Sequence, residues 1–163
     1  MSNAFRARRL PVILTIVAAM MLAIVPLPGW AEPFRPDWVA ITLIYWCLHM
    51  PRYFGVGSAW LVGIVLDVAQ GTLLGQHALA LSLIAFLTVK FHLQLRVFPL
   101  SQMAATVLAL LAVYRFVLFW INGVAGVGAP LVAYWGPVLT GTLLWPVADF
   151  ILRTIPRRRR PSG

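Results

Sequence analysis

The sequence predicts an all-α polytopic membrane protein, a bundle of six transmembrane helices that forms a single integral-membrane domain over residues 1–163. Composition is one reason: the chain is 61% hydrophobic and only 10% charged, with a mean hydropathy of +0.89, so its solvent must be lipid. The spacing of the apolar residues is the other, because they fall into stretches separated by short connections. These stretches cover residues 10–27, 38–50, 54–74, 78–95, 103–121 and 131–152.

The positions of the lysines and arginines predict the orientation. With six crossings and a cytoplasmic N-terminus, eleven of the thirteen cationic residues fall in the cytoplasm, whereas Arg35 falls outside and Arg115 lies within a span. An excess of Lys and Arg on the cytoplasmic side follows the positive-inside rule. We therefore expect a multi-pass protein of the bacterial inner membrane with both termini cytoplasmic. The eleven residues are Arg6, Arg8, Arg9, Arg52, Lys90, Arg96 and, in a basic tail over residues 153–163, Arg153, Arg157, Arg158, Arg159 and Arg160.

The second stretch is short for a transmembrane helix. Its thirteen residues, 38–50, would make about 20 Å of helix, against a hydrocarbon core of about 30 Å. A re-entrant segment is the alternative. If the stretch did not cross, however, most of the later cationic residues would lie outside, so the charge distribution favours a crossing.

Charge and motif content exclude several classes of function. A net charge of +9 would suggest nucleic acid as the partner of a soluble protein, but here the arginines gather at the ends of spans, where anionic lipid head groups are the expected counterions. Cys47 is the only cysteine, so an intramolecular disulfide and a cysteine-based metal site are excluded. The chain has no catalytic signature such as HExxH, GxSxG or a P-loop. We expect no enzyme activity, no cofactor, no metal and no nucleic acid.

The third stretch carries small residues at every fourth position. Ala59, Gly63, Gly71 and Gly75 form with Asp67 a predicted continuous ridge along one face of a helix. Small side chains let two helices approach closely, so this face is expected to pack on protein. A carboxylate among them is costly in lipid, which leaves two interpretations of Asp67: a satisfied packing contact, or a group that binds a ligand or a proton.

Depth within the membrane suggests a partner for Asp67. Counted from the cytoplasmic ends of their spans, Asp67 and Arg115 lie at a similar height in the outer half of the bilayer. An ion pair between them would neutralise two charges that lipid disfavours, so we predict an intramembrane pair of Asp67 and Arg115. Two further sites are weaker candidates. Asp149 and Arg153 are expected to form a local ion pair near the cytoplasm, and Gln76 and His77 to lie near an outer pocket.

Several short motifs, spread over nearly the whole chain, match one known family. They are Arg35-Pro36-Asp37-Trp38, Tyr45-Trp46, Pro51, Gly57, Leu66-Asp67-Val68, Gly71, Leu73-Leu74-Gly75-Gln76-His77-Ala78-Leu79, Arg96-Val97-Phe98-Pro99 and Leu144-Trp145-Pro146. With the chain length, the six spans and the basic C-terminus, they resemble the rod shape-determining protein MreD family. The most specific part is residues 67–79.

The resemblance implies a non-enzymatic inner-membrane component of the cell-wall elongation machinery. In that family the implied partners are the single-span scaffold MreC, the actin-like MreB, the glycosyltransferase RodA and the elongation transpeptidase PBP2. It also implies a fold like that of the substrate-binding subunits of energy-coupling-factor transporters.

Two functions from different classes therefore stay open. One is a membrane scaffold that binds partner transmembrane helices through the glycine-rich face of the third helix and its neighbours. The other is a small-molecule or lipid-binding membrane protein, or transporter subunit, with an outward pocket lined by Asp67, Gln76, His77 and Arg115. Homo-oligomerisation is compatible with either, and membrane lipids are expected partners of both.

Overall fold

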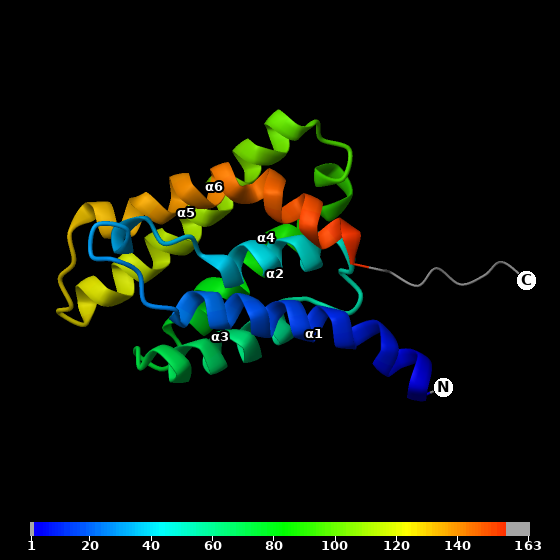
Figure 1. Ribbon diagram of the computed structural model, residues 1–163, viewed down its shortest axis with the longest axis horizontal. Helices are drawn as coiled ribbons and strands as arrows, with labels where there is room; N and C mark the ends of the chain where they lie inside the picture. Colours follow the sequence, from blue (N-terminus) through cyan, green and yellow to red (C-terminus); the bar gives the residue numbers. More distant parts are fainter. Residues whose placement is uncertain (1, 156–163) are drawn as a thin grey trace, which may run out of the picture.

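The computed structural model describes the backbone of residues 2–155 and the side chains of residues 9–155, and within this part all regular secondary structure is helical (Figure 1). The six predicted helices are present. The predicted basic tail lies, beyond its first residues, outside the described part of the chain. The elements are α1 (Ser2–Ile24), the short 3-10 helix η1 (Glu32–Phe34), α2 (Trp38–His49), α3 (Val56–Gln70), α4 (Gln76–Leu95), α5 (Leu100–Val124) and α6 (Leu131–Thr154).

Consecutive helices run in opposite directions along the long axis of the molecule (Figure 1). The start of α1, the connections from α2 to α3 and from α4 to α5, and the end of α6 therefore lie at one end. We call the other end, which holds the turn between α3 and α4, the turn end. With an even number of alternating helices, both ends of the described chain lie on the same side of the bundle, as six crossings require.

Three of the described helices are long and apolar enough to cross a membrane: α4, α5 and α6. The apolar part of α1 over Arg9–Ile24, α2 and α3 are shorter. Large apolar side chains are exposed along these helices, for example Leu14, Leu139 and Phe150, each more than half exposed. Such a surface is suited to lipid and not to water, and it agrees with a multi-pass membrane protein.

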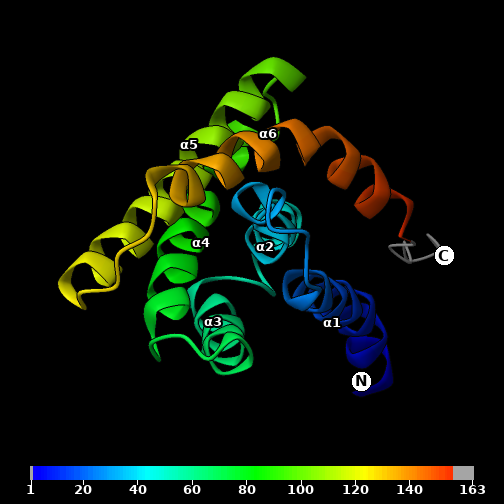
Figure 2. The ribbon, with the colours of Figure 1, turned by 60° about the vertical axis from the view of Figure 1, so that its left-hand side comes forward.

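The short helix α2 is surrounded by protein. It lies inside the bundle, in contact with α1, α4, α5 and α6, and ten of its twelve residues are buried (Figure 2). A helix enclosed by other helices does not itself have to match the thickness of the hydrocarbon core. Trp46 of α2 donates a hydrogen bond from Nε1 to Thr15 Oγ1 of α1 at 2.9 Å, which joins the two helices across the core.

Both ends of α2 are held by other helices through arginines. At its C-terminal end, Arg96 donates from Nε to the carbonyl oxygen of Leu48 at 3.0 Å and from Nη2 to that of His49 at 2.9 Å. These are carbonyls of the last turn, which have no partner within the helix. A positive charge there also interacts favourably with the negative end of the helix dipole. The N-terminal end is held through Asp37, as described below.

The predicted small-residue ridge is correct for its first half only. Gly63 lies directly against α4, where a Cβ atom would overlap the backbone of His77 and Ala78, and Ala59 is fully buried. Close approach of α3 and α4 therefore requires a glycine at position 63. This face is covered by α4 of the same chain, so the prediction that it binds a partner helix is wrong.

Gly71 and Gly75 do not belong to that ridge. Helix α3 ends at Gln70, four residues before the predicted end, because Gly71 takes a left-handed conformation with φ of 64° and caps the helix. Gly75 has φ of 98° and precedes the first residue of α4. Both glycines shape the turn between α3 and α4, where other residues would be strained.

Substitution of Gly63 tests this packing. Gly63→Leu places a branched side chain where backbone already lies, so we expect α3 and α4 to separate and the unfolding midpoint in detergent to fall, with overpacking alone costing about 1–3 kcal/mol or more. Val65→Leu, at a position of α3 that is 54% exposed, is the control and should be silent. Equal stability of the two variants would contradict the assigned contact.

Candidate functional site

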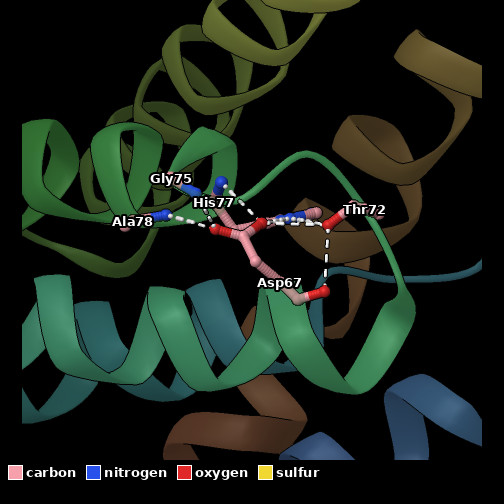
Figure 3. Close-up of polar contacts among 5 residues, drawn as sticks. All are labelled: Asp67, Thr72, Gly75, His77 and Ala78. Atoms are coloured by element: carbon pink, nitrogen blue, oxygen red, sulfur yellow. Dashed lines mark hydrogen bonds and ion pairs between the residues drawn. The ribbon is translucent and has the colours of Figure 1, made fainter.

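One group of polar residues lies at the turn end of the bundle, around the buried carboxylate of Asp67. Asp67 lies in the last turn of α3 and has no exposed surface. The short turn brings the N-terminus of α4 directly over this side chain (Figure 3). Helix N-termini present backbone N–H groups without partners in the helix, and they carry partial positive charge.

The carboxylate of Asp67 accepts hydrogen bonds from backbone N–H groups at the N-terminus of α4. Its Oδ2 accepts a hydrogen bond from the backbone N–H of Gly75 at 2.8 Å and a longer one from Ala78 at 3.4 Å, and Oδ1 accepts from the N–H of His77 at 3.0 Å. The Thr72 hydroxyl donates to Oδ1 at 3.0 Å, and His77 Nδ1 lies 2.7 Å from the same oxygen. The carboxylate is thus a cap supplied by one helix to the next, as Figure 3 shows.

Arg115 forms a separate pair with Asp37. Its Nε donates to Asp37 Oδ2 at 2.7 Å, and its Nη2 donates to Oδ1, which makes the contact bidentate. Asp37 directly precedes α2, yet its side chain makes no hydrogen bond to that helix and turns to α5 instead. The side chains of Arg115 and Asp37 are only 18% and 10% exposed, so the pair is largely removed from solvent and holds the start of α2 against the middle of α5.

A third polar contact closes the end of α1. Arg35 donates from Nη1 to the carbonyl oxygen of Ala23 and from Nη2 to that of Val25 at 2.6 Å, and it pairs with Glu32 at 3.0 Å. Ala23 lies in the last turn of α1, and Val25 directly follows the last residue of that helix. The connection of residues 25–37 is therefore folded back on the bundle by its own arginine.

These groups line a cavity of about 590 Å³ at the turn end. Apolar walls come from α1, α2 and α6, including Ile24, Val39 and Pro137. Asp67 itself does not line the cavity, but two side chains in contact with its carboxylate, Thr72 and His77, do. The polar lining comprises Glu32, Arg35, Asp37, Gln70, Thr72, His77, Tyr114 and Arg115.

The cavity has the chemistry of a binding site for a polar or amphipathic molecule. It combines an ion pair, an imidazole and a phenol with apolar walls, the usual combination in small-molecule sites. Among the described residues, no group of three histidines, cysteines or acids lies close enough to hold a metal ion. The Cys47 thiol is buried in α2, away from these residues.

Comparison with known proteins identifies the family. The family model described as rod shape-determining protein MreD matches residues 5–154. The chain belongs to the MreD family. A Haemophilus influenzae relative named "Rod shape-determining protein MreD" is 28% identical over 145 residues, which cover 87% of this chain and 88% of that protein. No solved structure matches the chain, so the expected likeness to energy-coupling-factor subunits stays a prediction.

Membership of the MreD family makes this chain a rod shape-determining, multi-pass membrane protein. The family is described as one of rod shape-determining proteins. The region expected to be most specific, residues 67–79, contains the Asp67 cap, the turn glycines and His77. The motif that includes Arg35 and Asp37 supplies two of the polar residues at the same cavity.

The predicted pair of Asp67 and Arg115 is wrong. Each has another partner, because α3 ends early and places Asp67 beside the backbone of α4, whereas Arg115 faces the start of α2. Asp37, placed by the sequence in an outer loop, was missed as a partner. Gly71 and Gly75 indicate a turn, and this signal could have revealed that Asp67 lies beside the start of the next helix. The position of Asp37 directly before an apolar stretch could have revealed it as the partner of Arg115.

The remaining predicted residues fall in different places. His77 lines the cavity with Arg115, whereas Gln76 points to another surface groove on α4. Arg153 Nη2 lies 2.8 Å from Asp149 Oδ2 across one turn of α6, the contact that the four-residue spacing predicts. That pair is largely exposed at its arginine and is remote from the cavity residues.

A double-variant cycle tests the pair of Asp37 and Arg115. Removal of one partner leaves a poorly solvated charge, so Asp37→Ala and Arg115→Ala should each lower the free energy of unfolding by up to about 3–5 kcal/mol, and the double variant by less than their sum. Denaturant titration in mixed micelles measures this. Arg153→Ala, at an exposed pair, should cost about 0.5 kcal/mol or less. Additive losses at Asp37 and Arg115 would show that the two side chains are not coupled.

Proposed function

We propose that this protein is a non-enzymatic inner-membrane scaffold of the bacterial cell-wall elongation machinery. In this role it binds MreC and links MreB with the peptidoglycan synthases RodA and PBP2, and so maintains rod shape. The observation that carries the proposal is the match to the MreD family over residues 5–154, nearly the whole chain. The partners follow from the resemblance to that family.

The architecture supports a scaffold and limits how it can act. The described chain consists of helices joined by short connections and contains no folded soluble domain. Within the described part of the chain, partners can meet lipid-facing helix surfaces and short loops. Large apolar side chains are exposed on α5 and α6, such as Phe116, Leu143 and Phe150. The internal ion pairs and the Asp67 cap keep the helices in one arrangement, as a scaffold needs.

Depletion and co-purification test the scaffold role. In a rod-shaped host, depletion of this protein should cause loss of rod shape while nutrient uptake continues, and tagged protein solubilised in mild detergent should co-purify MreC. An unrelated tagged polytopic protein from the same membrane is the control. Normal rods after depletion, or no enrichment of MreC over the control, would contradict the proposal.

The orientation proposed is that of the sequence analysis, with both termini in the cytoplasm. Support comes from the alternating direction of the six helices, which leaves both ends of the described chain on one side (Figure 1). A reporter active only in the cytoplasm should work when fused at Arg8 or Arg160, and a periplasmic reporter should work within residues 123–130. Activity of the periplasmic reporter at Arg160 would indicate an odd number of crossings and refute this topology.

The cavity supports a second candidate function, the binding of a small molecule or lipid. A volume of about 590 Å³ is ample for a drug-sized ligand or a lipid head group, and Arg115, His77 and Tyr114 face it. Mass spectrometry of the purified protein distinguishes the two functions. A bound molecule that is required for complementation would favour the second, whereas a ligand-free protein that co-purifies MreC would favour the scaffold.

A further inference from the structure

A second hollow of the surface, a groove on α3 and α4, shares no lining residue with the polar cavity. It is lined by the first turn of α3, by the turn before α4, by the first two turns of α4 and by Ile121 of α5. From Val56 to Gln70, α3 is about 20 Å long, so a groove that reaches both its first residue and the turn beyond its end extends over most of that helix. The groove residues are Val56, Gly57, Trp60, Leu73, Leu74, Gly75, Gln76, Leu79, Ser82 and Ile121.

Two polar side chains in this apolar groove lack partners. Gln76 is 94% buried as a residue, since only 6% of its surface is exposed, and its Oε1 has no hydrogen bond among the described residues. The Oγ of Ser82 is likewise buried and unpaired. By contrast, the nearby backbone N–H groups of Gly75 and His77 donate hydrogen bonds to the carboxylate of Asp67. A buried polar atom without a partner costs about 1–3 kcal/mol.

Water is a poor source of the hydrogen bond that Ser82 lacks. Ser82 lies six residues beyond Gln76 along α4, about 9 Å deeper in a helix that is apolar and long enough to span a membrane. A lipid acyl chain could fill the groove, but it carries no hydrogen-bonding group. The occupant that suits both the shape and the unpaired atoms is a helix with its own polar side chains.

The groove also indicates the character of that helix. No charged or titratable side chain lines it, so a charged partner residue would find no counterion there. Gly57 and Gly75 leave room for close backbone approach, and a Cβ atom at Gly57 would meet nothing within 4 Å. The Gln76 amide can offer either its oxygen or its nitrogen after a half-turn of its last torsion, so it can accept from or donate to a hydroxyl or an amide.

We infer that this groove is the docking surface for a transmembrane helix of a partner protein, which places an uncharged polar side chain, Ser, Thr, Asn or Gln, against Gln76 and Ser82. This inference rests on the proposed scaffold role. It moves the partner-binding surface from the Gly63 face of α3, which α4 occupies, to the neighbouring face that the two helices leave open.

Crosslinking in intact membranes tests the location, with co-produced tagged MreC as the probe. Leu79 and Leu139 are similarly exposed, at 58% and 60%, but only Leu79 lines the groove. Leu79→Cys should crosslink to cysteines placed along the MreC span, and Leu139→Cys, on α6, should not. The native Cys47 is buried and gives little background. Crosslinking from Leu139→Cys alone would overturn the inference.

Three further variants test the chemistry. Gly57→Leu fills the groove, and Gly123→Leu is its matched control, because a Cβ atom meets nothing within 4 Å at either glycine and Gly123 lies outside the groove. Gln76→Leu removes the unpaired amide. Gly57→Leu and Gln76→Leu should each lower MreC co-purification about tenfold, while the unfolding midpoint of the isolated protein stays the same or, for Gln76→Leu, rises. Gly123→Leu should bind like the wild type.

The outcomes separate this inference from the proposed function. If the wild type does not co-purify MreC, the scaffold proposal fails, and the inference that rests on it fails as well. If the wild type and all three variants co-purify MreC equally, the scaffold stands and the groove is not its docking surface. If Gly57→Leu and Gln76→Leu instead abolish association between two differently tagged copies of this chain and leave MreC binding unchanged, the occupant is a second copy, and the inference of a foreign helix is overturned.

Discussion

The arrangement of the helices at the turn end depends on one carboxylate, Asp67, and on the backbone that it holds. A helix that starts inside the bundle leaves N–H groups without water to bond them, and a buried acid needs compensation for its charge. Here the two costs offset each other, because Asp67 of α3 accepts from the backbone of Gly75, His77 and Ala78. The contact fixes where α4 begins, and therefore where Gly63 meets Ala78 and where His77 faces the cavity.

The same physical constraint explains the placement of the arginines. A guanidinium can donate hydrogen bonds to several carbonyl oxygens that the C-terminal end of a helix leaves free, and its positive charge stabilises the negative end of the helix dipole. Arg35 does this for α1, and Arg96 does it for α2. Arg115, deeper in the bundle, instead finds a carboxylate, Asp37. This chain has few charged residues, and several of these residues make contacts that join one helix to another.

Such contacts between helices suit a protein that acts as a scaffold. Helix α2 touches four other helices, and it is held at one end through Asp37 and at the other by Arg96 (Figure 2). The outer helices then have one side packed on this centre and one side free for lipid or for partners. Three buried side-chain polar atoms of the described residues lack a hydrogen-bond partner, Arg35 Nε, Gln76 Oε1 and Ser82 Oγ, and the last two belong to residues of the groove.

Composition, apolar periodicity and the distribution of cationic residues were sufficient to predict the helical class, the number of helices, the close packing at Gly63 and the local contact of Asp149 with Arg153. These features depend on residues near one another in sequence or on the average polarity of a segment. The partners of Asp67 and Arg115, the enclosure of α2 and the end of α3 at Gln70 were decided by tertiary structure. Depth counted along separate spans ignores how each helix is rotated and where it stops. Helix α3 ends four residues before its predicted end, and Asp67 in its last turn lies beside the backbone of the next helix and not beside a guanidinium.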